Sequence, residues 1–169
     1  MVIEKALHLV GNLSKHNVEA FEQFEKYQIV HWIYKCLAAH HKNRKILKNA
    51  VYAIGNISFY GERFAGQIKD APKYLLEGLV SEDPHLLLNT ISAISNLLRH
   101  SSYHLQGLLD ACVFQRILTL FTTATTPDQA ENMLRPIVKA AKYPKFFESY
   151  SKRALRDLME RSQQRGLLK

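Results

Sequence analysis

The 169-residue sequence has only two cysteines, seven glycines and five prolines, and it contains no run of 18 apolar residues. Cys36 and Cys112 are expected in apolar helices of different repeats, which argues against a disulfide framework and favours a reducing compartment. The lack of a long apolar run excludes a transmembrane helix, and the start M-V-I-E-K-A-L-H lacks the basic and apolar regions of a secretory signal. We therefore expect a cytoplasmic protein.

Motifs of catalysis and metal binding are also missing. The sequence has no Gly-rich phosphate loop, no G-x-S-x-G turn, no H-E-x-x-H pair, and neither the H-R-D nor the D-F-G motif of protein kinases. Cys36 with His40 and His41 does not make a tetrahedral ligand set, because one thiolate and two adjacent histidines lie on different helix faces. We predict no enzyme activity, no catalytic residues, no metal and no cofactor.

A helical pattern that recurs four times dominates the sequence. In residues 48–60, K-N-A-V-Y-A-I-G-N-I-S-F-Y, apolar side chains at i, i+3, i+4 and i+7 form one stripe, while asparagine and tyrosine side chains share another face. Related patterns occupy 4–16, 88–100 and, in degraded form, 131–143, at spacings of 44, 40 and 43 residues. Such spacings are typical of armadillo or HEAT solenoids, whose repeats span roughly 40 to 47 residues.

The sequence therefore predicts an all-α, right-handed solenoid of about four repeats, in one domain over residues 1–169. The third helix of each repeat is expected at about 2–14, 44–59, 84–100 and 127–142. Shorter helices are expected between them, including one at 62–69 and one at 102–110, and a last helix is expected at 151–164. Because this cycle begins at a third helix and ends at a second, we expect a fragment of a longer protein, or a first helix covered by another subunit.

The three-helix cycle resembles the armadillo repeat, through the N-A-x-x-A-I-G-N-I pattern that ends its third helix. Within that class, K-N-A-V-Y-A-I-G-N-I-S-F-Y followed by L-N-T-I-S-A-I-S-N-L-L-R-H-S is similar to the C-terminal armadillo region of Fused-type serine/threonine kinases. The resemblance implies a non-catalytic regulatory or scaffold segment. It also implies a kinesin-like or ciliary protein partner and a location at cilia or microtubules.

Asparagines at one recurring position are the first candidates for binding a partner. In armadillo proteins, asparagines at the positions of Asn12, Asn56 and Asn96 line a concave groove and bind the main chain of an extended peptide, since an amide offers both a donor and an acceptor. The same amides can instead tie adjacent repeats together. Lys139 takes the place of asparagine in the fourth copy.

Basic residues gather on the same predicted face. Arg135, Lys139 and Lys142 lie at i, i+4 and i+7, and a solvated helix face is the alternative to a binding stripe. Pro136 within this helix is expected to kink it or end it early. The predicted groove residues are Asn12, Lys48, Tyr52, Asn56, Asn96, Arg99, His100, Arg135, Lys139 and Lys142. Their positive charge favours an acidic protein segment over the basic cargo of import adaptors.

The net charge of +8 lies almost entirely at the C-terminal end. Ten Lys and Arg stand against three Asp and Glu from Arg135 onwards, whereas residues 1–134 hold thirteen against twelve. One alternative function is a scaffold or homodimer that uses the first helix and the convex face. Another is a basic surface for phosphate polymers. Nucleic acid and membrane are the less favoured partners, because the last helix lacks Trp and Phe on its apolar side.

Overall fold

The computed structural model describes residues 2–15, 17 and 19–168, and this part of the chain contains helices and turns but no strand. The elements are α1 (Val2–Ser14), α2 (Ala20–Lys26), α3 (Ile29–His40), α4 (Arg44–Phe59), the 3-10 helix η1 (Ala65–Ile68), α5 (Ala71–Leu79), α6 (Pro84–Leu97), α7 (Leu105–Asp110), α8 (Val113–Thr122), α9 (Pro127–Ala140), α10 (Phe146–Ser149) and α11 (Lys152–Gln164).

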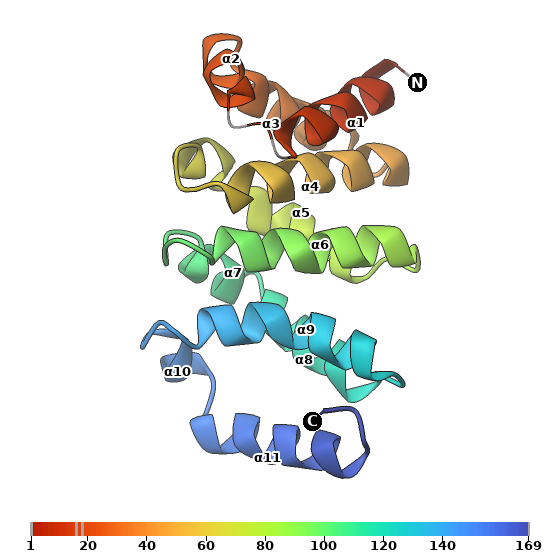
Figure 1. Cartoon of the computed structure of the whole chain (residues 1–169), viewed down its shortest axis with the longest axis vertical. Coiled ribbons are helices and arrows are strands. Elements are labelled where there is room, and N and C mark those ends of the chain that lie inside the picture. The colour runs from red at the N-terminus through yellow and green to blue at the C-terminus, as the bar shows by residue number, and fades with distance from the viewer. Residues whose placement is uncertain (1, 16, 18, 169) are drawn as a thin grey trace.

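Four long helices, α1, α4, α6 and α9, stack in one layer and run in the same direction (Figure 1). We call these four the groove helices. Each of α4, α6 and α9 packs against the previous groove helix and against the helix that precedes it, namely α3, α5 and α8. The result is an elongated solenoid in which the repeating unit contacts mainly its two neighbours.

Side-chain caps fix where three of the groove helices begin. Asn43 Oδ1 accepts hydrogen bonds from the backbone N–H groups of Lys45 and Ile46 at the start of α4. Asp83 caps α6 in the same way, and Thr126 Oγ1 accepts from the Gln129 N–H at the start of α9. A proline follows each of these last two caps, where its missing N–H costs no helical hydrogen bond.

Small residues let the groove helices pack closely. Ala53 and Ala93 are completely buried, and a Cβ added to Gly55 of α4 would lie 3.2 Å from the Cα of Ala93 on α6. Towards the C-terminus the core is filled by large aromatic side chains instead, and Phe114 packs edge-on against Phe146 with ring centroids 5.1 Å apart. The apolar stripe that defines the sequence pattern is therefore the surface along which successive repeats meet.

Several helices end earlier than their sequence pattern predicts. Helix α6 ends at Leu97 instead of residue 100, and α9 ends at Ala140 instead of 142, so that Arg99, His100 and Lys142 lie in the turns that follow. The expected helices at 62–69 and 102–110 shrink to η1 and α7, and the short α10 was not expected. Each shortened end lies where the chain leaves the groove layer, and Pro144 also disfavours helical backbone at the residue before it.

Two local expectations differ from the structure. Helix α9 continues through Pro136 to Ala140, so Pro136 does not end the helix, and the expected kink stays a prediction. Cys112 does not lie within an apolar helix. It is exposed in the turn before α8, with a left-handed backbone (φ 54°), while Cys36 is buried in α3.

Candidate protein-binding groove

A groove of about 480 Å³ runs along the layer of groove helices, where the C-terminal parts of α4, α6 and α9 come together. It is lined by Phe59, Ser92, Ser95, Asn96, Arg99, Glu131, Leu134, Arg135, Val138 and Lys139. Four of the predicted groove residues, one asparagine and three cations, therefore meet at one place.

Apolar side chains form part of the groove surface and were missed by the sequence analysis. Phe59 is 39% exposed and Val138 is 50% exposed, although both are large and apolar. The Arg99 guanidinium lies 4.1 Å from the centroid of the Phe59 ring, in a cation–π contact that joins the end of α4 to the turn after α6. The sequence gives only a weak signal that Phe59 is exposed, namely its position outside the apolar stripe of its helix.

The groove has a net positive charge. Arg99, Arg135 and Lys139 line it together with one acid, Glu131. Arg135 Nη2 lies 3.4 Å from Glu131 Oε1 one helical turn away, and both side chains are more than half exposed, so this ion pair contributes little. The field at the groove therefore favours a ligand with negative charge.

Asn12, Asn56 and Asn96 stand at one recurring position, and we call them the asparagine ladder. Two of them use their amide nitrogens in hydrogen bonds within the chain. Asn56 Nδ2 donates to the carbonyl oxygen of Gly11 at 2.9 Å, and Asn96 Nδ2 donates to that of Gly55 at 2.9 Å. These bonds link α4 to α1 and α6 to α4, as the alternative interpretation of the ladder predicts. Among the described residues, no hydrogen bond uses Oδ1 of Asn56 or Asn96. Each side chain is half-buried, and its Oδ1 has the capacity to accept a hydrogen bond.

The predicted groove residues nearest the N-terminus are not part of this groove. Tyr52 Oη donates to Asn12 Oδ1 at 3.3 Å, and the Tyr52 ring stacks on His8 with centroids 6.3 Å apart. Lys48 Nζ forms an ion pair with Asp83 Oδ2 at 3.2 Å at the opposite end of α4 from Phe59.

Asn56 does not line the groove either, but borders a separate pocket with Phe59, and the other two predicted residues lie beyond the edge of the groove. His100 Nε2 is 2.8 Å from the carbonyl oxygen of Phe59, and Lys142 is exposed in the turn after α9. The predicted residues that line the groove therefore all belong to α6, the turn after it and α9.

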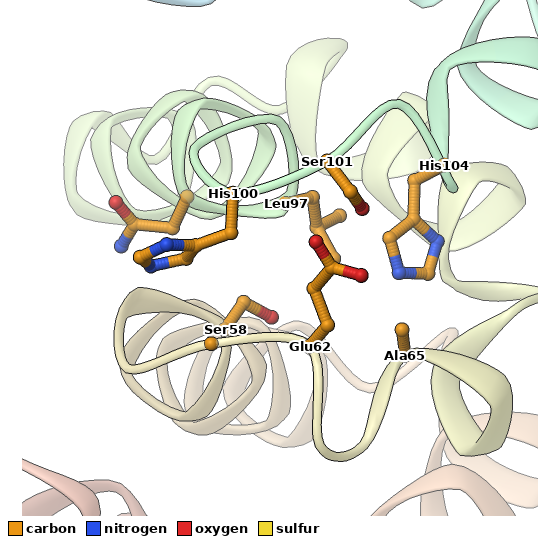
Figure 2. Close-up of a pocket in the computed structure, with 9 residues that line it drawn as sticks. Ser58, Glu62, Ala65, Leu97, His100, Ser101 and His104 are labelled. Carbon is orange, nitrogen blue, oxygen red and sulfur yellow. The ribbon is translucent and has the colours of Figure 1, made fainter.

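A small polar cavity lies beside the groove, between the turn after α4 and the turn after α6 (Figure 2). Glu62 extends its carboxylate into the space between His100 and His104. His104 is only 4% exposed, and its Nδ1 has no hydrogen-bond partner among the described residues. Burial lowers the pKa of His104 to about 4, which the negative charge of Glu62 only partly opposes.

Neither a cluster of metal-ligating side chains nor a membrane-spanning helix is found in the described part of the chain. No group of three or more His, Cys, Asp and Glu side chains there is arranged to hold a metal ion. Within the same residues, no helix has the length and apolar character needed to cross a bilayer.

Comparison with known proteins identifies the fold. No protein-family model matches the sequence, and no curated protein matches it. A designed armadillo repeat protein, YIII(Dq)4CqI, superimposes with a TM-score of 0.68 at 22% identity over 80% of this chain and 57% of its own. Two engineered proteins of known structure superimpose with TM-scores of 0.73 and 0.72, at 18% and 19% identity, over 86% of this chain and 59% and 60% of theirs.

The chain has an armadillo-like solenoid fold. It spans less than two thirds of the length of these solved structures. The comparisons confirm the predicted all-α solenoid class. In a fold of this kind the stacked repeats form one long concave surface.

The ladder bonds give a testable contribution to the stability of the armadillo-like fold. Replacing Asn96 by Ala removes the bond from Nδ2 to the Gly55 carbonyl, so we expect a loss of about 1 kcal/mol in the free energy of unfolding. Asn96→Asp places a carboxylate oxygen against the same carbonyl and should destabilise more than Ala. Urea denaturation checks both. Equal stability of wild type and Asn96→Asp would show that the bond is unimportant.

Proposed function

We propose that this chain is a non-catalytic protein-binding module whose groove between α4, α6 and α9 binds an extended, acidic segment of a partner protein. The observation that carries the proposal is the convergence of Arg99, Arg135 and Lys139 on a surface that also exposes Phe59 and Val138. A purely solvated helix face does not need two large exposed apolar side chains among its cations. A ligand with apolar side chains beside carboxylates satisfies both features.

The ladder supports an extended main chain as the bound element. Asn56 and Asn96 occupy equivalent positions of adjacent groove helices, and each keeps Oδ1 as an acceptor while Nδ2 is engaged. They would accept hydrogen bonds from backbone N–H groups of the ligand. Each such bond contributes about 0.5 to 1.5 kcal/mol, so apolar and charged contacts must supply most of the affinity.

The more specific identity is also a proposal. The two quoted third-helix sequences support a regulatory or scaffold region of a Fused-like signalling kinase. In that case the acidic segment would belong to a kinesin-like or ciliary protein, and the chain would work in the cytoplasm at cilia or microtubules. Partners of this kind are identified by affinity purification once the groove has been tested.

Selection from a random peptide library displayed on phage tests the groove directly. We expect the wild-type chain to enrich peptides with Asp or Glu next to an aromatic or aliphatic residue. Synthetic peptides from the selected sequences should bind at least tenfold more weakly, about 1.4 kcal/mol, to a chain with Arg99→Glu, Arg135→Glu and Lys139→Glu, as measured by fluorescence anisotropy.

A control with the same change of charge separates the groove from the overall field. Lys35, Lys42 and Lys69 are exposed and do not line the groove, so their triple replacement by Glu should leave most of the affinity intact. If this control loses as much affinity as the groove variant, net charge attracts the peptide and the groove is not the site. Failure to enrich acidic sequences would also contradict the proposal.

A further inference from the structure

A second pocket of about 180 Å³ adjoins the groove, where the C-terminal ends of α1 and α4 lie side by side (Figure 1). It is lined by Lys15, Asn56, Phe59 and Tyr60, and we call it the aromatic pocket. Phe59 also lines the groove, whose other residues belong to α6, the turn after it and α9. The Phe59 side chain therefore stands between two adjoining cavities on the layer of groove helices.

Packing within the chain holds the aromatic walls of this pocket in place. The rings of Phe59 and Tyr60 lie edge-on with centroids 5.0 Å apart, and Tyr60 packs edge-on against Phe21 with centroids 5.5 Å apart. Phe21 is only 4% exposed. The Arg99 guanidinium, 4.1 Å from the centroid of the Phe59 ring, adds a further contact. A pocket whose walls are already fixed loses little side-chain freedom when a ligand enters.

Two polar groups of the aromatic pocket have no partner among the described residues. Lys15 is exposed, and no ion pair of the described chain engages its ammonium group. Its backbone N–H donates to the Asn12 carbonyl at 3.1 Å, which fixes its place in the turn after α1. The other group is Oδ1 of Asn56, whose Nδ2 is engaged by Gly11. The pocket therefore offers a ligand one cation and one hydrogen-bond acceptor.

The size and the lining of the aromatic pocket fit a six-membered ring. An apolar cavity of about 150 Å³ accommodates benzene, and this pocket measures about 180 Å³. Aromatic rings attract one another in edge-on contacts, and an ammonium group is attracted to the face of a ring. Phe59 and Tyr60 supply the rings, and Lys15 supplies the ammonium group. An aliphatic side chain would gain neither of these attractions.

The distance between the two cavities sets the spacing of two anchors in a bound segment. The aromatic pocket lies between α1 and α4, and the groove is centred on α6, so their centres are about one and a half repeats, or about 12 to 15 Å, apart. An extended chain rises about 3.3 Å per residue, so this distance corresponds to about four residues. An even spacing also places both side chains on the same face of an extended chain.

We propose that the aromatic pocket binds an aromatic side chain of the partner segment, four residues from the apolar residue that lies in the groove beside its acidic neighbours. This inference rests on the proposed function, because it describes the ligand of the same groove. The segment crosses Phe59 in an extended conformation, and Asn56 Oδ1 accepts a main-chain N–H beside the aromatic residue. Acidic segments without an aromatic residue at this distance should therefore bind more weakly.

Peptides that the wild-type chain selects from the random phage library test the second anchor. We expect Phe, Tyr or Trp to be enriched four positions from the apolar residue of the acidic core, on the side that corresponds to the direction of the bound segment. The most enriched sequence is then made as a fluorescein-labelled synthetic peptide. Replacing its aromatic residue by Ala should weaken binding at least about fivefold, as measured by fluorescence anisotropy.

A variant of Lys15 assigns this loss to the aromatic pocket. Lys15→Ala should weaken binding of the selected peptide at least about threefold, but should scarcely change binding of the peptide that lacks the aromatic residue, because only the ring contacts the ammonium group. Lys5→Ala changes another exposed lysine of α1 by the same charge and should bind both peptides like wild type. Circular dichroism checks that both variants keep their helices.

The outcomes distinguish the aromatic pocket from the groove. Selected peptides with an acidic core but no aromatic residue at a fixed distance would overturn this inference and leave the proposed function standing. An equal loss for both peptides in Lys15→Ala would do the same, since it would reflect charge alone. Enrichment of the aromatic residue at three or five positions would overturn the extended register. If no acidic core is selected, the proposed function fails, and this inference fails with it.

Discussion

Acidification from pH 7.5 to pH 4.5 is expected to lower the free energy of unfolding by roughly 2 to 3 kcal/mol through His104 alone. The pKa of His104 is lowered to about 4 in the folded chain by burial, whereas its ordinary value is 6.5. Between these values the unfolded chain binds a proton that the folded chain does not bind. Stability is therefore fully present above pH 6.5 and is lost as the pH falls towards 4.

The variant His104→Phe isolates this contribution. Phenylalanine has a similar shape, can keep the edge-on packing against Tyr103 and removes the buried Nδ1 that has no partner among the described residues. We expect urea denaturation to show a nearly flat profile for the variant between pH 7.5 and 4.5, and a stability at pH 7.5 equal to or above that of wild type. Parallel profiles for the two chains would mean that His104 binds a proton equally well in both states.

Periodicity was enough to predict the solenoid. Apolar residues at helical spacing, repeated at about 40 residues, specify where one groove helix packs on the next, and the cap residues Asn43, Asp83 and Thr126 fix where three of them begin. Helix ends were less predictable. Their position depends on how the chain turns towards the next short helix, which His100 stabilises through a contact with Phe59, 41 residues earlier.

The helical spacing of residues predicts which side chains share a face of a groove helix, but it does not predict their hydrogen bonds or their exposure. A helical pattern places Arg135 and Lys139 on one face, and in the structure both line the groove together with Arg99. It does not show which donors are already used inside the chain, and the Nδ2 atoms of Asn56 and Asn96 are engaged by carbonyl groups one repeat earlier. The pattern also does not single out Phe59, which lies outside the apolar stripe and whose exposure depends on the neighbouring repeat.

Replacement of Gly78 by Ala is expected to destabilise the fold by about 2 kcal/mol through overpacking. Gly78 of α5 is buried against Thr90 of α6, and an added Cβ would lie 2.1 Å from Thr90 Oγ1 and 3.1 Å from its Cβ and Cγ2. Rotating the Thr90 side chain moves Oγ1 but leaves its Cβ too close, and it breaks the bond from Oγ1 to the Leu86 carbonyl. The helix preference of Ala, about 1 kcal/mol over Gly, does not offset this clash.

A double-mutant cycle with Thr90→Ala shows whether the clash is the cause. Thr90→Ala alone should cost about 1 kcal/mol from the lost hydroxyl and methyl packing. The double variant Gly78→Ala, Thr90→Ala removes Oγ1, the closest atom, and Cγ2, and keeps only the Cβ contact at 3.1 Å, so it should be more stable than the sum of the single changes predicts by at least about 1 kcal/mol. Gly66→Ala, where the added Cβ would come no closer than 3.8 Å to the Tyr103 hydroxyl, is the matched control and should be nearly neutral. Strict additivity of the Gly78 and Thr90 changes would show that α5 and α6 separate without strain, and that glycine is not required where these helices cross.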